Sequence, residues 1–125
     1  KLESLMISHP NEILESAKEY KVIGIDEVQF LDDSIIDVCK TLASQNKRII
    51  AAGLDTDYLG KPFGPMPKIM CEADYLDKLR AICVLCGNPA SYTQRTSSDA
   101  DQVVLGELDK YEARCRNCFK LPKDN

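Results

Sequence analysis

Two pairs of cysteines in this chain have the spacing of metal ligands. Cys83 and Cys86 form the first pair, and Cys115 and Cys118 form the second. Two residues between partners let both sulfur atoms turn inward on one tight loop, or knuckle. Two knuckles together supply four thiolates, which is the ligand set of a tetrahedral structural Zn²⁺ site. A bound Zn²⁺ would pin both ends of the segment 87–114 and present it as a closed loop from a rigid base.

Two disulfide bonds, or four reduced cysteines in a core, are the alternatives to zinc. Disulfides need an oxidising compartment, and no secretory signal precedes this domain, although the chain begins with Lys1 and not with Met. A thioredoxin-like redox pair is disfavoured because neither pair opens a helix after a strand. The isolated Cys39 and Cys71 are both interpreted as small buried hydrophobic residues. Reduced cysteines and the missing signal favour the cytoplasm.

A second candidate for chemistry is the carboxylate pair Asp26 and Glu27, which follows the apolar run 21–25. In open α/β sheets, ligands bind beyond the carboxyl ends of the strands. An aspartate at such a place can hold Mg²⁺ through its water ligands. A neighbouring glutamate can accept a proton from an attacking hydroxyl. The alternative is that both carboxylates cap the following helix or are simply solvated.

The partner of such an aspartate in a nucleotide enzyme is a phosphate-binding loop of the type GxxxxGK[ST]. The single Gly-Lys pair of the chain is Gly60-Lys61, and it is followed by Pro62, where a serine or threonine is required. Either the carboxylate pair is unrelated to nucleotides, or the phosphate loop lies upstream of Lys1.

Hydrophobic patterning indicates the elements that must position these residues. The apolar runs 21–25 and 48–53 are predicted to be buried parallel strands. Between them, 31–45 has apolar residues at three- and four-residue steps, which is typical of a helix, so the three elements form a right-handed βαβ unit. The remaining expected elements are a helix at 11–20, a short helix or turn from residue 69, a loop at 60–67, and strands at 90–95 and 102–106 joined by a polar turn.

Composition limits the function further. The 125 residues have room for one compact domain or for a domain with a small appendage. A hydrophobic fraction of 44% and a charged fraction of 29% are ordinary for a soluble globular protein. The net charge of −4 argues against general nucleic-acid binding, which depends on excess Lys and Arg. No apolar run approaches the ~20 residues that span a bilayer, so a membrane partner is not expected.

Seven blocks of the sequence, in this order, resemble the zinc-containing, type II thymidine kinases. The blocks are 25–30 (IDEVQF), 52–55 (AGLD), 61–64 (KPFG), the first cysteine pair, 91–95 (SYTQR), 105–106 with 109–111 (LG and DKY), and the second cysteine pair. The resemblance implies an α/β fold. Residues 1–80 would be the C-terminal part of a P-loop (RecA-like) domain with a parallel sheet, and residues 81–125 a small zinc-binding domain with a lasso loop over the nucleoside.

The same resemblance implies an activity and a site. The family transfers the γ-phosphoryl group of ATP to the 5′-hydroxyl of thymidine (and deoxyuridine) in nucleotide salvage, and usually forms homotetramers. Glu27 would be the general base, Asp26 would serve Mg²⁺, and the four cysteines would hold zinc. The implied nucleoside contacts are Phe30, Leu54, Tyr58 and Phe63 around the base, Thr93 near the thymine methyl group, backbone groups of Val104, Leu105 and Gly106 on the base, and Tyr111 beside the sugar.

Two other functions stay open at this stage. Without a phosphate loop, this polypeptide alone is expected not to bind ATP productively or to catalyse, so a non-catalytic remnant that only assembles with partners is one alternative. The other is a nucleic-acid-binding zinc ribbon attached to an ATPase fragment. The acidic balance, and the lack of a basic stripe between the knuckles, argue against the ribbon.

Overall fold

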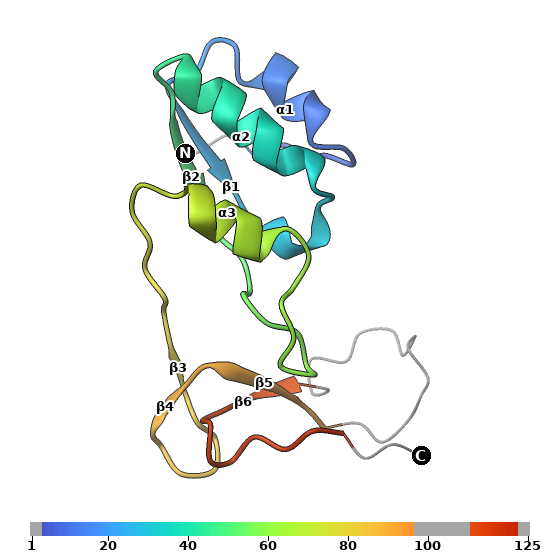
Figure 1. Cartoon of the computed structure of the whole chain (residues 1–125), viewed down its shortest axis with the longest axis vertical. Helices are drawn as coiled ribbons and strands as arrows, with labels where there is room; N and C mark the ends of the chain where they lie inside the picture. Colours follow the sequence, from blue (N-terminus) through green and yellow to red (C-terminus); the bar gives the residue numbers. More distant parts are fainter. Residues whose placement is uncertain (1–3, 97–110, 123–125) are drawn as a thin grey trace. The chain divides into compact units, whose positions relative to one another are not determined.

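The computed structural model describes residues 4–96 and 111–122 (Figure 1). The chain forms two compact units, and each is built from more than one segment. Unit 1 comprises Lys1–Asp55 and Pro62–Leu76, and unit 2 comprises Thr56–Lys61 and Asp77–Asn125. The domains expected from the resemblance, 1–80 and 81–125, stay predictions.

Unit 1 is a mixed α/β unit around a small parallel sheet. It contains, in chain order, α1 (Asn11–Ser16), β1 (Val22–Ile25), the short 3₁₀ helix η1 (Val28–Phe30), α2 (Ser34–Ser44), β2 (Arg48–Ala51) and α3 (Met66–Glu72). β1 and β2 pair in parallel, from Val22 opposite Arg48 to Ile25 opposite Ala51, so the predicted strand–helix–strand order is confirmed. None of the described helices is long and apolar enough to cross a membrane.

Helix α3 begins earlier than predicted, inside the segment 60–67 that was expected to be a loop. Pro65 is its N-cap residue and Pro67 lies in its first turn. Proline is tolerated there because the first N–H groups of a helix have no partner within it. Two prolines that were interpreted as loop signals therefore mark a helix start.

The core of unit 1 lies on one side of the sheet. The buried face of α2 consists of Ile35, Val38 and Leu42, and α2 lies between α1 and α3 (Figure 1). Successive strand side chains point to opposite faces. Among the described residues, Val22 and Ile50 remain 57% and 54% exposed, so the prediction of strands buried on both faces is wrong for the described chain.

Unit 2 is built from short antiparallel pairs. Its strands are β3 (Ala81–Ile82), β4 (Pro89–Ala90), β5 (Tyr92–Arg95) and β6 (Tyr111–Arg114). β3 pairs with β4, and β5 pairs with β6. The strand predicted at 90–95 is thus interrupted at Ser91, and its observed partner β6 was not predicted. The strand predicted at 102–106 lies outside the described residues.

The two isolated cysteines have different environments. Cys39 is half-buried and packs against the core of unit 1, and this burial raises the pKa of its thiol. Cys71 is exposed, so its interpretation as a buried residue is wrong. Helix α3 buries Met66 and Ile69, which are one turn apart. At 100° per residue, Cys71 falls on the opposite side of the helix.

Candidate metal centre and acidic strand tip

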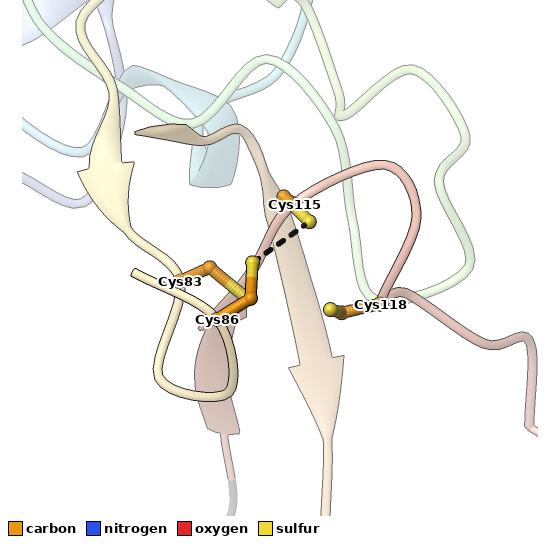
Figure 2. Close-up of side chains that lie close together, drawn as sticks. All are labelled: Cys83, Cys86, Cys115 and Cys118. Carbon is orange, nitrogen blue, oxygen red and sulfur yellow. Dashed lines mark hydrogen bonds between the residues drawn. The ribbon is translucent and has the colours of Figure 1, made fainter. Parts of the chain in front are cut away.

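The four paired cysteines converge in unit 2, as Figure 2 shows. The sulfur atoms of Cys83, Cys86, Cys115 and Cys118 all lie within 4.8 Å of one another, and those of Cys86 and Cys115 are 3.6 Å apart. A tetrahedral site with Zn–S bonds of about 2.3 Å places its sulfur atoms about 3.8 Å from each other. All four thiols are free, which excludes the disulfide interpretation for this structure. The cluster therefore has both the donor set and the spacing for Zn²⁺.

Backbone hydrogen bonds shape each knuckle independently of a metal. In the first knuckle, the N–H of Gly87 donates to the carbonyl of Cys83 over 2.9 Å. Gly87 has φ +78°, a left-handed conformation that favours glycine. In the second knuckle, the N–H of Cys118 donates to the carbonyl of Cys115 over 3.1 Å. The sulfur atoms are thus directed by the turns and not by long flexible side chains.

The knuckle N–H groups also stabilise the charged form of two ligands. The backbone N–H of Cys115 donates to the sulfur of Cys83 and is the main reason that its pKa is lowered to about 6. The N–H of Cys118 likewise lowers the pKa of Cys115. The pKa of Cys118 is instead raised to about 12, mainly by its hydrogen bond with the Cys115 thiol. Since zinc binds thiolates, the buried pair Cys83 and Cys115 is prepared for a metal.

Arg114 supports the second knuckle from β6. Its Nη1 donates to the carbonyl of Cys118 over 3.1 Å, and its Nε donates to Glu112 over 2.6 Å. The side chains of Arg114 and Glu112 are only 17% and 29% exposed, so this ion pair is partly shielded from water. The guanidinium therefore joins the backbone of the knuckle to the sheet.

A second group of candidate residues meets on the β5–β6 pair. Alternation along β5 places Thr93 and Arg95 on the same face. Thr93 lies opposite Ala113, and Arg95 lies opposite Tyr111. The guanidinium carbon of Arg95 is 5.0 Å from the centre of the Tyr58 ring. Three predicted nucleoside contacts of unit 2, Tyr58, Thr93 and Tyr111, are thus gathered around Arg95.

The carboxylate pair lies at the end of β1 in unit 1. Asp26 and Glu27 are both exposed, and Asp26 Oδ1 accepts the backbone N–H of Glu27 over 2.8 Å. Glu27 has φ 53° and ψ 42°, a left-handed conformation that is uncommon outside glycine. Such conformations cost free energy and are concentrated at functional sites. The backbone is therefore held in an unfavourable turn at the carboxyl end of a parallel strand.

Hydrogen bonds join the two strand ends behind these carboxylates. The N–H of Val28 donates to the carbonyl of Ala52 over 3.0 Å, and the N–H of Leu54 donates to Gln29 Oε1 over 3.1 Å. Gln29 is only 6% exposed, so a buried side-chain oxygen takes the place of a backbone carbonyl as the acceptor for the Leu54 N–H. Sequence reasoning missed this role of Gln29. The signal that could have indicated it is a polar residue within the otherwise apolar run 28–31.

The predicted base-pocket residues of unit 1 lie around the same strand ends. The rings of Phe30 and Phe63 meet edge to face with centroids 5.5 Å apart. Phe30 and Leu54 remain 67% and 47% exposed. Gly64, with φ +52°, has no room for a Cβ because that atom would overlap the Gln29 carbonyl. The remaining predicted contacts, Val104, Leu105 and Gly106, lie outside the described residues.

These features define a class: an α/β protein with an acidic strand tip and a separate unit that carries a Cys₄ zinc-type centre. The sequence model of the thymidine kinase family matches residues 2–119. The chain therefore belongs to the thymidine kinase family.

Two relatives give the extent of the match. The chain is 48% identical over 122 residues to a thymidine kinase of Rhodothermus sp. (strain ITI 518), covering 98% of this chain and 57% of the relative. It is 48% identical over 118 residues to a thymidine kinase of Bacteroides thetaiotaomicron, covering 94% of this chain and 59% of the relative. The chain thus spans a little more than half the length of the relatives it matches.

Proposed function

We propose that this chain carries the catalytic base and nucleoside-binding residues of a thymidine kinase. The reaction is transfer of the γ-phosphoryl group of ATP to the 5′-hydroxyl of thymidine, or of deoxyuridine, in cytoplasmic nucleotide salvage. The observation that carries the proposal is the exposed carboxylate pair at the end of β1, with Glu27 in a left-handed backbone conformation, in a chain that also holds the zinc-type cluster. Family membership over residues 2–119 supports the same reaction.

At the strand tip, Glu27 is proposed as the general base. A carboxylate that is exposed beyond a parallel strand can accept the proton of the 5′-hydroxyl as that oxygen attacks the γ-phosphorus. Asp26 is proposed to hold Mg²⁺ through water ligands. Its Oδ1 already accepts the Glu27 N–H, which leaves Oδ2 for those waters. The two neighbouring carboxylates would then have different tasks.

The nucleoside contacts are proposed residue by residue. In unit 1, Phe30 and Leu54 offer exposed apolar surface, and the half-buried Phe63 packs against the Phe30 ring, as a base pocket requires. In unit 2, Thr93 on β5 and Tyr111 on β6 neighbour Arg95, which contacts the Tyr58 ring of the loop 56–61. Zn²⁺ is proposed to have a structural task only, since four protein ligands leave no open position for a substrate.

For the whole protein, ATP and Mg²⁺, a P-loop (RecA-like) fold and a homotetramer are proposed on the resemblance alone. Direct backbone hydrogen bonds to the base from Val104, Leu105 and Gly106 are proposed on the same ground. The proposed lasso loop between the knuckles would exclude water from the reacting phosphoryl group, which strengthens electrostatic stabilisation in such sites.

The decisive experiment measures phosphoryl transfer by the full-length protein with labelled ATP and Mg²⁺. Thymidine and deoxyuridine are expected to be phosphorylated, and purine nucleosides are not. No thymidine-dependent transfer would contradict the proposal. A salt-dependent complex with DNA, formed in the absence of such transfer, would instead favour a nucleic-acid-binding zinc ribbon.

A further inference from the structure

The guanidinium group of Arg95 has an unusual environment. Its Nε atom is buried and has no hydrogen-bond partner in the part of the chain that the structure describes. A buried donor without an acceptor is unfavourable unless another interaction offsets the loss of water. The interaction that the structure shows is the ring of Tyr58, whose centre lies 5.0 Å from the guanidinium carbon. Arginine is well suited to such stacking because its guanidinium is planar and weakly hydrated.

Tyr58 belongs to a short loop that is rigid within itself. Asp57 Oδ1 accepts the N–H groups of Leu59 and Lys61 over 2.9 and 3.0 Å, and the Asp57 carbonyl accepts the N–H of Gly60 over 2.9 Å. With its backbone tied in this way, the loop can move as one piece. The position of the Tyr58 ring then depends on what holds the loop against β5.

Among the described residues of unit 2, two contacts of this loop differ in kind. A Cβ on Gly60 would lie 3.6 Å from the Phe119 ring and 3.8 Å from the Tyr92 ring, so one end of the loop passes close to these aromatic side chains. The other contact is the stack of Arg95 on Tyr58. The first contact fixes the backbone near Gly60, whereas the second acts directly on the ring that the proposed function assigns to the base.

We propose that Arg95 is a positioning residue for the nucleoside: its guanidinium fixes the Tyr58 ring beside Thr93 and Tyr111, so that the three side chains form a prepared surface for the base and sugar. This inference rests on the proposed function. In this proposal Arg95 acts through the Tyr58 ring and not on the reacting phosphoryl group or the 5′-hydroxyl. A surface that is ordered before binding lowers the free-energy cost of taking up the nucleoside, and therefore affects thymidine affinity more than turnover.

The test is steady-state kinetics of the full-length protein with Arg95→Met and Arg95→Lys. Methionine keeps an unbranched side chain of similar length but has no charge, and lysine keeps the charge but lacks the planar group. Arg95→Met is expected to raise the thymidine KM about 3- to 30-fold, the range expected for a partly shielded cation–π contact. The kcat and the ATP KM are expected to change less than twofold. Arg95→Lys is expected to fall between wild type and Arg95→Met in thymidine KM.

Arg80 provides a matched control in the same unit. It is an exposed arginine directly before β3, outside β5, β6 and the loop that carries Tyr58. Arg80→Met is therefore expected to leave the thymidine KM within twofold of wild type. Zinc content, measured for every variant, separates a local effect from loss of the metal centre.

A double-mutant cycle completes the test. In a Tyr58→Leu background, Arg95→Met is expected to change the thymidine KM less than twofold, because the ring that Arg95 positions is gone. The inference is overturned if zinc-loaded Arg95→Met has a wild-type thymidine KM. It is equally overturned if the ATP KM or kcat changes instead, since Arg95 would then act on the phosphates. If the wild-type protein does not phosphorylate thymidine, the proposed function itself has failed.

Discussion

The two units of this chain differ in the interactions that stabilise each of them. In the described residues of unit 1, nine buried side chains form one apolar cluster that α1, β1, α2 and α3 share. In the part of unit 2 that the structure describes, the corresponding cluster has three buried residues, Cys83, Ala90 and Cys115, and two of these are candidate metal ligands. Small units with so little apolar burial need a metal or disulfides for stability. The acidic strand tip is thus positioned by hydrophobic packing, whereas unit 2 carries, in place of a large apolar core, a cysteine cluster that could hold zinc.

The units are nevertheless alike in one respect, because each uses a buried glutamine in place of a backbone partner. Gln29 accepts the N–H of Leu54 and joins two strand ends in unit 1. Gln94 in unit 2 donates to the Lys120 carbonyl and accepts the Lys120 N–H, both over 2.9 Å. A side-chain amide has the same donor and acceptor as a peptide group. Both units therefore fix an irregular segment with a polar bridge.

The largest effect is expected from the loss of one candidate zinc ligand, because all four of these ligands lie in unit 2 and none lies in unit 1. Cys118→Ser in the full-length protein should abolish zinc binding, because a structural zinc contributes on the order of 10 kcal/mol of folding free energy and needs all its thiolates. Metal analysis should find less than about a tenth of the zinc of wild type, and limited proteolysis should cut within 77–125 first. Cys71→Ser, which replaces an exposed thiol outside the cluster, is the control. Retained zinc in Cys118→Ser would contradict the metal assignment.

The next effect concerns the strand tip and should leave the metal centre untouched. Glu27→Gln in the full-length protein should lower kcat by ~10²- to 10⁴-fold, since the amide cannot accept the hydroxyl proton. Thymidine KM and zinc content should stay within about twofold of wild type. Asp37→Asn, on the exposed side of α2, removes a carboxylate of the same unit and serves as control. Unchanged turnover of Glu27→Gln would remove Glu27 as the base.

A smaller effect tests how tightly the strand tip is packed. Gly64→Ala would place a Cβ against the Gln29 carbonyl at a residue with φ +52°, so the free energy of unfolding of unit 1 should fall by about 2–4 kcal/mol. Gly24→Ala is the matched control, because a Cβ at Gly24 meets no atom within 4 Å. Denaturant unfolding followed by circular dichroism measures both. Equal stability of the two variants would show that the approach of Gly64 to Gln29 carries no constraint.

The smallest effect tests the polar bridge of unit 2. Gln94→Leu leaves the N–H and carbonyl of Lys120 without their partner, which should cost about 1–3 kcal/mol in the zinc-loaded protein. The same change at the exposed Gln45 of unit 1 should stay within about 0.5 kcal/mol. Thermal unfolding of both variants at matched zinc content gives the comparison. A neutral Gln94→Leu would mean that water replaces the bridge without loss.

The parts that the sequence predicted well depend on local patterns. Two residues between cysteines constrain a tight turn wherever it lies, so the four cysteines that converge in unit 2 could be picked out as candidate ligands before the structure. The strand–helix–strand order of unit 1 follows from hydrophobic periodicity, which is also local. Both predictions needed no knowledge of which distant segments meet.

The parts that the sequence did not predict depend on distant contacts. The pairing of Arg95 with Tyr58 requires a register that no local pattern specifies. The exposure of Val22 and Ile50 depends on which sheet face the helices cover. The segment Tyr111–Arg114 alternates polar and less polar residues without a strong apolar face, so β6 carried little signal of its own. The expected site roles of Asp26 and Glu27, and those of the nucleoside contacts, stay predictions.

Each unit consists of two separate segments of the chain, and this interleaved order matters for protein engineering and for evolution. The chain changes unit between Asp55 and Thr56, again between Lys61 and Pro62, and a third time after Leu76. A hybrid that exchanged only the cysteine-bearing tail between two relatives would leave Tyr58 with its old parent and take Arg95 from the new one. A hybrid that keeps unit 2 from one parent would have to exchange two segments together: the six residues Thr56–Lys61 and the tail Asp77–Asn125.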